Sequence, residues 1–258
     1  MKRKLLWLAA ACSMFACRPH MQERSDFAKH FTEASVEGAF VLYDLQRDKY
    51  FVHDLARSNR GFVPASTFKI FNALVALETG VLRDENETLQ WDGVTREVAA
   101  WNQDHSLRSG FKVSAVWFYQ EMARRIGPER MQHYVNLAGY GNRDIRGGID
   151  LFWLTGELRI TPREQIDFLV RLYQNRLPFA QSTLTMVKDI FIFEQNENYV
   201  LRGKTGWAGK TGWFVGYVER KEAVYFFATN IDIAKDEDVK ARIAVTKNIL
   251  RDLRLIEP

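Results

Sequence analysis

Residues 64–80 read PASTFKIFNALVALETG, and the prediction of the fold starts from this stretch. Its apolar side chains recur at the spacing of a helix, and Gly80 is a residue type that often ends one. Segments typical of β-strands lie on both sides of it, close to the two ends of the chain. We therefore expect an α/β (α+β) fold. In it, an antiparallel sheet built from both chain ends is flanked by helices, and a helical block is inserted between its strands.

The predicted strands form two groups. The first group is a hairpin over residues 38–45 and 49–52, and the second comprises residues 199–203, 213–219 and 223–231. Further helices are predicted over residues 116–126, after the capping box Thr161-Pro162-Arg163-Glu164, and over residues 239–253. Because no linker interrupts these elements, residues 18–258 are expected to form a single domain.

The composition is that of a globular protein. Of the 258 residues, 47% are hydrophobic and 26% are charged, which excludes disordered, collagen-like and coiled-coil chains. The formal net charge is +4, but residues 2–4 read KRK, so the rest of the chain is nearly neutral. The basic residues form no patch interleaved with aromatic residues, so no nucleic-acid partner is expected. The histidines have no metal-ligand spacing, and no metal site is expected.

The first 17 residues predict a signal peptide, because the positive residues 2–4 precede an apolar run from Leu5 to Cys17. The run is shorter than the roughly 20 residues that span a bilayer. We expect a periplasmic protein with no stable membrane span in its mature form. A short membrane anchor, or a lipid on Cys12 or Cys17, is the alternative.

The pattern Ser-x-x-Lys occurs twice, at Ser66–Lys69 and at Ser109–Lys112. On a helix the two side chains face the same side, and a neutral lysine can then take the serine proton. Ser66 is followed at once by the apolar helix, whose free N–H groups favour negative charge. Ser109 stands in a polar stretch that we interpret as a loop. For Ser66 the alternative is an ordinary N-cap.

Lys-Thr-Gly also occurs twice, at residues 204–206 and 210–212. The first copy ends a strand-like run, where a lysine can direct a fixed cation into a cleft, and the second is interpreted as a turn. A phosphate-binding loop is excluded because both copies lack its earlier glycine. Ser114 is either a helix cap or a second hydroxyl that relays a proton.

Together these motifs resemble the class D serine β-lactamases, the oxacillinases, which have the serine β-lactamase/transpeptidase-like fold. The resemblance rests on residues 66–69, 114–116, 140–142 and 204–206. It extends to residues 64–65, 91–93, 153–158 and 212–216 and covers nearly the whole chain in order.

The resemblance implies hydrolysis of β-lactam antibiotics, penicillins and oxacillin-like compounds, through an acyl-enzyme on Ser66, and hence antibiotic resistance. It implies a CO2-derived carbamate on Lys69 as general base and no other cofactor. Ser114 would pass a proton to the lactam nitrogen, supported by Lys204. The other implied roles are carbamate support by Trp153 with an apolar wall of Phe68, Val116 and Leu154, an oxyanion hole at the N–H groups of Ser66 and Trp207, and substrate binding by Thr205, Gly206 and Arg242.

Two other interpretations stay open. One is a β-lactam sensor that is acylated without turnover, although sensors of that kind follow several membrane helices. The other is a penicillin-binding transpeptidase, which Trp153 and the segment at residues 140–142 disfavour. The sequence predicts neither the range of β-lactams nor the oligomeric state.

Overall fold

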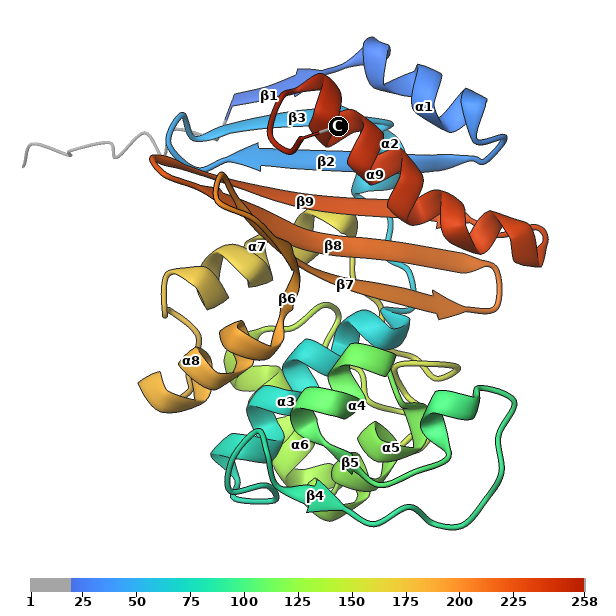
Figure 1. Cartoon of the computed structure of the whole chain (residues 1–258), viewed down its shortest axis with the longest axis vertical. Helices are drawn as coiled ribbons and strands as arrows, with labels where there is room; N and C mark the ends of the chain where they lie inside the picture. Colours follow the sequence, from blue (N-terminus) through green and yellow to red (C-terminus); the bar gives the residue numbers. More distant parts are fainter. Residues whose placement is uncertain (1–19, 258) are drawn as a thin grey trace, which may run out of the picture.

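A seven-stranded sheet crosses the part of the chain that the computed structural model describes, residues 20–257 (Figure 1). The strand order is β1-β3-β2-β9-β8-β7-β6. The strands are β1 His20–Glu23, β2 Gly38–Asp44, β3 Lys49–His53, β6 Ile192–Gln195, β7 Val200–Ala208, β8 Thr211–Arg220 and β9 Ala223–Asp232. A separate two-stranded ribbon consists of β4 Thr88–Leu89 and β5 His105–Ser106.

The two chain ends meet in this sheet, as predicted. Strand β2 pairs antiparallel with β9, with Gly38 opposite Ile231 and Asp44 opposite Tyr225. The expectation of a wholly antiparallel sheet is wrong at one edge, because β1 pairs in parallel with β3. Strands β1 and β6 were not predicted from the sequence, since each has 4 residues and such short runs carry little periodicity.

The helices lie between and after the strands. They are α1 Ala28–Glu33, α2 Leu55–Ser58, α3 Lys69–Glu78, α4 Leu107–Val113, α5 Val116–Ile126, α6 Pro128–Ala138, α7 Pro162–Tyr173, α8 Gln181–Ile190 and α9 Ala241–Asp252. The predicted bounds of α5 are confirmed, and so is the capping box of α7, in which the Thr161 hydroxyl accepts a hydrogen bond from the Glu164 N–H. Short 3₁₀ turns are η1 Ser25–Phe27, η2 Ala65–Phe68, η3 Ala99–Trp101 and η4 Asp236–Lys240.

The sheet is buried on both faces, which explains the continuous apolar run of β9. Phe226 and Ala228 point to the larger core, which the sheet shares with α7 and with helices α3–α6, the helical block. Phe227 and Ile231 point to a second core beneath α1 and α9. Successive side chains of a strand alternate between faces, so a strand covered on both sides is apolar throughout. Figure 1 shows α9 against one face and α7 with the helical block against the other.

Helix α3 lies inside the helical block, and every residue from Lys69 to Leu77 is buried. A helix that is apolar on all sides is an interior helix. The turn η2 leads into it, and the ring of Phe68 in that turn lies within 5.5 Å of the rings of Phe71, Tyr140, Phe152 and Trp153, measured between centroids. This aromatic cluster fixes the entry to α3, which holds the first Ser-x-x-Lys motif.

Within residues 20–257 no helix combines the length and the apolar character that crossing a membrane requires. The predicted signal peptide over residues 1–17, with Cys12 and Cys17, lies outside the described residues.

Two glycines with positive φ allow a test of how tightly the helical block is packed. Gly141 has φ +51°, and a Cβ there would lie 2.1 Å from the carbonyl oxygen of Arg159. Gly80 has φ +69°, with nothing within 4 Å of such a Cβ. Gly80→Ala is therefore expected to cost only the backbone strain, about 1 kcal/mol, whereas Gly141→Ala adds a backbone clash and should cost about 3 kcal/mol or more. Urea unfolding of both variants measures the difference, and equal costs would contradict the close packing at Gly141.

Candidate active site

Ser66 lies in η2 at the entry to α3, and its exposed fraction is 9%. The position at a helix N-terminus is confirmed. The alternative of an ordinary N-cap is wrong, since Pro64 holds the N-cap position of η2 and Phe68 that of α3. The preceding residue, Ala65, adopts φ +51°, and its N–H donates to the carbonyl oxygen of Trp153 at 2.9 Å. A left-handed φ costs a non-glycine residue about 1–3 kcal/mol, so the surroundings must hold this turn in place.

A buried chain of hydrogen bonds holds that turn. The Thr67 hydroxyl donates to the Pro64 carbonyl oxygen at 2.7 Å, and the Gln165 side-chain amide donates to the Thr67 hydroxyl oxygen at 2.8 Å. Thr67 and Gln165 are both fully buried. Helix α7 therefore supports the backbone on both sides of Ser66.

Lys69 lies one turn after Ser66 and is fully buried. Its Nζ donates to the Ser114 carbonyl oxygen at 2.5 Å and to the Ser114 Oγ at 2.9 Å. The Nζ also lies 5.2 Å from the centroid of the Tyr119 ring. Burial, and secondarily the charge of Lys204, lower the pKa of Lys69 well below its ordinary value, because both disfavour the ammonium form.

Ser114 ends α4 as its C-cap, with φ 56° and ψ 41°. Its interpretation as a cap that starts the next helix is wrong, because α5 begins after Ala115 and has no side-chain cap. The left-handed backbone turns Ser114 into the site, where its Oγ accepts hydrogen bonds from Lys69 and from Lys204, each at 2.9 Å. With both lone pairs occupied, the hydroxyl proton remains free to be donated.

The second Ser-x-x-Lys pattern does not belong to this site. Ser109 was predicted in a loop, but it lies inside α4 and forms a capping box with Ser106. The error arose because α4 has only 7 residues and includes Gly110, so its helical signal is weak.

Lys204 lies within β7, which continues to Ala208 beyond the predicted end at Gly203. Besides Ser114, its Nζ bonds the Thr205 carbonyl oxygen at 3.0 Å. Burial lowers the pKa of Lys204 to about 7, and the charge of Arg242 acts in the same direction. Lys210 of the second copy is exposed in the turn before β8, so the first Lys-Thr-Gly copy lines the site.

Gly206 allows β7 to approach the serine turn. A Cβ at this position would lie 3.1 Å from the Pro64 carbonyl oxygen and 3.3 Å from the Ser66 nitrogen. The next residue, Trp207, exposes 45% of its surface, and its indole N–H donates to the Gly209 carbonyl oxygen at 2.9 Å. The backbone of Gly206–Trp207 and the Ser66 turn therefore face each other across a narrow gap.

Trp153 is fully buried and stacks on Phe68, with ring centroids 5.4 Å apart and planes inclined by 21°. Its indole N–H is buried and has no hydrogen-bond partner within residues 20–257. Val116 and Leu154, which the sequence assigned to the wall around Lys69, are only half-buried. The ring of Tyr119 also lies beside the amine, with its centroid 5.2 Å from the Lys69 Nζ.

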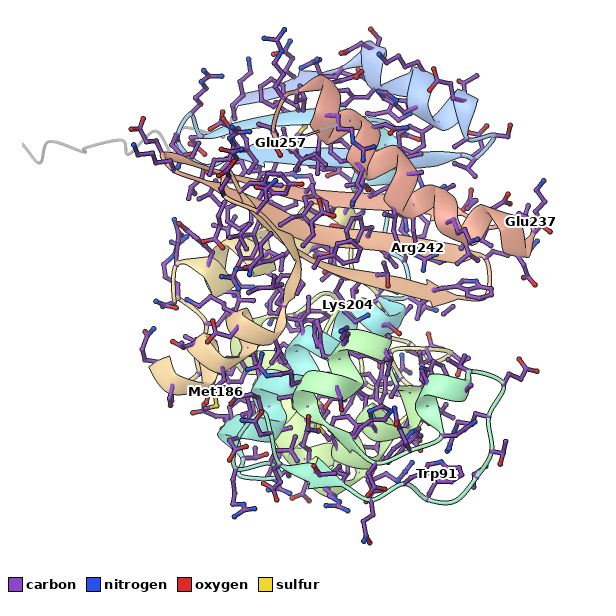
Figure 2. The ribbon with its side chains drawn as sticks, in the orientation of Figure 1. Trp91, Met186, Lys204, Glu237, Arg242 and Glu257 are labelled. Carbon is purple, nitrogen blue, oxygen red and sulfur yellow. The ribbon has the colours of Figure 1, made fainter. Side chains whose placement is uncertain are left out.

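Arg242, the second residue of α9, lies close enough to Lys204 for its charge to lower the pKa of that lysine. Its Nη1 donates to the Val239 carbonyl oxygen, and its buried Nε has no partner among the described residues. Burial lowers the pKa of Arg242 to about 10. Figure 2 shows Lys204 on β7, at the place where the sheet meets the helical block. It shows Arg242 near the start of α9. Among residues 20–257 no cluster of side chains has the composition of a metal site.

Comparison with known proteins agrees with this geometry. The family model described as penicillin binding protein transpeptidase domain matches residues 38–253. The chain is 42% identical to Beta-lactamase OXA-48 of Klebsiella pneumoniae over 253 residues, 96% of each protein. It is 51% identical to a crystal structure of the class D β-lactamase YbXI from Nostoc, with a TM-score of 0.87, covering 89% of this chain and 99% of that one. The chain belongs to the class D β-lactamases. The class D β-lactamase FUS-1 (OXA-85) from Fusobacterium nucleatum subsp. polymorphum, 38% identical, gives a TM-score of 0.89 over 92% of this chain and 100% of that one.

In this class D β-lactamase, Tyr140-Gly141-Asn142 has a structural role. The Asn142 amide donates to the Glu157 carbonyl oxygen, and its Oδ1 accepts from the Arg159 N–H, both at 2.9 Å. These bonds close the loop that carries Trp153.

Sequence reasoning missed two residues of the site, Tyr119 and Gln165. Tyr119 lies five positions after Ser114 and shares a face of α5 with Val116, so helical spacing alone could have suggested it. Gln165 directly follows the capping box of α7, but its partner Thr67 is 98 positions away in the chain. No local pattern predicts such a contact.

The lowered pKa of Lys204 predicts a pH-dependent gain in stability for Lys204→Met. An unfolded lysine titrates near 10.4 and folded Lys204 near 7, so the unfolded chain binds more protons between these values and wild-type stability rises with pH. The variant should be more stable than wild type by on the order of 2–4 kcal/mol at pH 6, and the difference should shrink toward pH 10. Urea unfolding across this pH range measures it. Exposed Lys221→Met serves as the control, and a difference that does not vary with pH would contradict burial of the amine.

Proposed function

We propose that this class D β-lactamase hydrolyses β-lactams through a covalent ester on Ser66, with Lys69, Ser114 and Lys204 as its other catalytic residues. The observation that carries the proposal is the pair of buried lysines that share the Ser114 hydroxyl beside the Ser66 turn. The names of its relatives support β-lactams as the substrate class.

Ser66 attacks the lactam carbonyl carbon while its hydroxyl proton passes to the base at Lys69. The C–O bond forms and the ring C–N bond breaks. The negative charge that develops on the carbonyl oxygen is stabilised by the N–H groups of Ser66 and Trp207, whose segments face each other across Gly206. Ser114 donates its proton to the departing nitrogen, and Lys204 keeps the Ser114 hydroxyl in the required orientation. Water then cleaves the ester and releases the opened product.

We further propose that Lys69 takes up CO2, with formation of an N–C bond and release of one proton. The residues present fit this group, because only a neutral amine adds CO2 and burial favours the neutral form of Lys69. The partnerless N–H of Trp153 is a donor suited to an anion at this place. When bound, the carbamate supplies a general base for acylation and deacylation.

Arg242, Thr205 and Gly206 bind the substrate carboxylate in this proposal. The buried Nε of Arg242 lacks a partner within residues 20–257, and a carboxylate would satisfy it. The low exposure of Lys204 strengthens its attraction for the same anion.

The proposal includes export to the periplasm, because residues 1–17 have the pattern of a signal peptide. Hydrolysis of β-lactams in the periplasm would confer antibiotic resistance. The alternative functions are a β-lactam sensor and a penicillin-binding domain, which form the same ester but do not turn over.

Hydrolysis of a chromogenic cephalosporin by the mature chain tests the proposal. Wild type should turn over, and faster with added bicarbonate. Lys69→Ala should lower the rate by at least about 100-fold, because a general base contributes roughly 10²–10⁴. Intact-mass measurement should then find acylated protein, or no reaction at all. Wild type that stays acylated for hours would support the sensor instead.

Trp153→Phe tests support of the carbamate. Phenylalanine keeps the stacking on Phe68 but removes the indole N–H, so half-maximal activity should need at least about tenfold more bicarbonate. Trp91→Phe is the matched control, since the Trp91 N–H donates to the Val94 carbonyl oxygen at the far end of the helical block (Figure 2). If Trp153→Phe and wild type respond to bicarbonate alike, the role of Trp153 is wrong.

A further inference from the structure

A cavity of about 490 Å³ continues from the proposed site along the edge of the sheet. Strand β6 pairs with β7 at residues 200–202 only, and the Gly203 N–H makes the last bond, to the Phe191 carbonyl oxygen at 3.0 Å. Beyond this point the edge of β7 is open. Lys204 and Thr205 line the cavity there, opposite α4. The volume lies in the range of small-molecule sites, about 300–1,000 Å³.

The cavity therefore shares two residues with the place where the substrate carboxylate is proposed to bind. In cephalosporins the carboxylate and the C3 substituent are attached to neighbouring carbon atoms of one ring. A carboxylate held by Lys204 and Thr205 therefore brings the C3 substituent within a few bonds of two residues that line this cavity. The cavity thus has the position of a subsite for that substituent.

The charged groups of the cavity favour an anion. Arg108 and Lys112 lie four residues apart on α4 and face the same side. Arg108 pairs with Glu85 at 3.1 Å, whereas the Lys112 side chain is exposed and has no ion pair or hydrogen bond within residues 20–257. Asp189 is the one acidic residue of the lining. With Arg108 compensated by Glu85, Lys112 and the ammonium form of Lys204, which a bound anion favours, outweigh Asp189.

The remaining lining is apolar. Phe111 is buried, while Ile192 and Phe193 each expose 40% of their surface at the α8–β6 junction. A flat ring can cover these side chains while a charge at its end reaches Lys112.

We propose that this cavity is a specificity subsite for β-lactams whose carboxylate-bearing ring carries a flat substituent that ends in an anion, with Lys112 as the recognising residue. The inference rests on the proposed function. It adds a substrate preference that none of the motifs implies.

Two cephalosporins with the same acylamino side chain test the subsite. One carries a neutral acetoxymethyl group at C3, and the other carries a heteroarylthiomethyl group that ends in a carboxylate. Wild type should show the higher kcat/KM for the anionic compound. Lys112→Glu should lower kcat/KM for that compound on the order of fivefold and leave the neutral compound nearly unchanged. The effect should act through KM and weaken in high salt, because exposed charges are screened.

Lys221→Glu is the matched control. It makes the same charge change in the exposed turn between β8 and β9, so it separates a local contact from the overall field of the protein. Two results would overturn the subsite while the proposed function stands. One is that Lys112→Glu and Lys221→Glu have the same effect. The other is that the ratio of kcat/KM for the anionic compound to kcat/KM for the neutral compound stays at the wild-type value in Lys112→Glu. If wild type hydrolyses neither compound, the proposed function fails and the subsite with it.

Discussion

The sharing of one hydroxyl by two buried lysines is the constraint on which the site depends. Lys69 comes from α3, Ser114 from the end of α4 and Lys204 from β7, and both amines donate to the same Ser114 Oγ. Two ammonium groups cannot remain charged side by side in a buried place, so at least one amine is driven to the neutral form. The fold therefore holds at least one buried amine in its neutral form.

Packing in the two cores offsets the free-energy cost of burying the amines of Lys69 and Lys204. The sheet is covered on both faces, and the aromatic cluster around Phe68 surrounds the entry to α3. Three backbone features bring the segments of Ser66, Ser114 and Lys204 close together. Ala65 and Ser114 have left-handed φ angles, and Gly206 has no side chain to keep β7 away from the Ser66 turn. Each depends on a distant partner, such as the Trp153 carbonyl oxygen that accepts from Ala65. Strain of this kind persists at functional sites because the surrounding contacts over-determine it.

The sequence predicts the elements of this protein better than their contacts. Periodicity and caps placed α5 and α7, and the order of short motifs led to Ser66, Lys69, Ser114 and Lys204. The hydrogen bond from Gln165 to Thr67 could not be placed, because it depends on which helix faces which. Tyr119 is different, since its spacing from Val116 on one helix was available in the sequence. The second Ser-x-x-Lys pattern also shows that local sequence does not predict tertiary contacts. Local spacing is equal in both copies, and only tertiary structure separates the buried Lys69 from the exposed Lys112.

The negative charge of a bound substrate is coupled to the protonation states of Lys69 and Lys204. An anion bound beside Lys204 and Arg242 favours the ammonium form of Lys204, and so raises a pKa that burial has lowered to about 7. A charged Lys204 in turn disfavours the ammonium form of Lys69, since the charge of Lys204 lowers the pKa of Lys69. Binding of a carboxylate therefore pushes the two amines toward opposite protonation states. The cation then lies where the substrate carboxylate is proposed to bind, and the neutral amine lies one turn after Ser66, the proposed nucleophile.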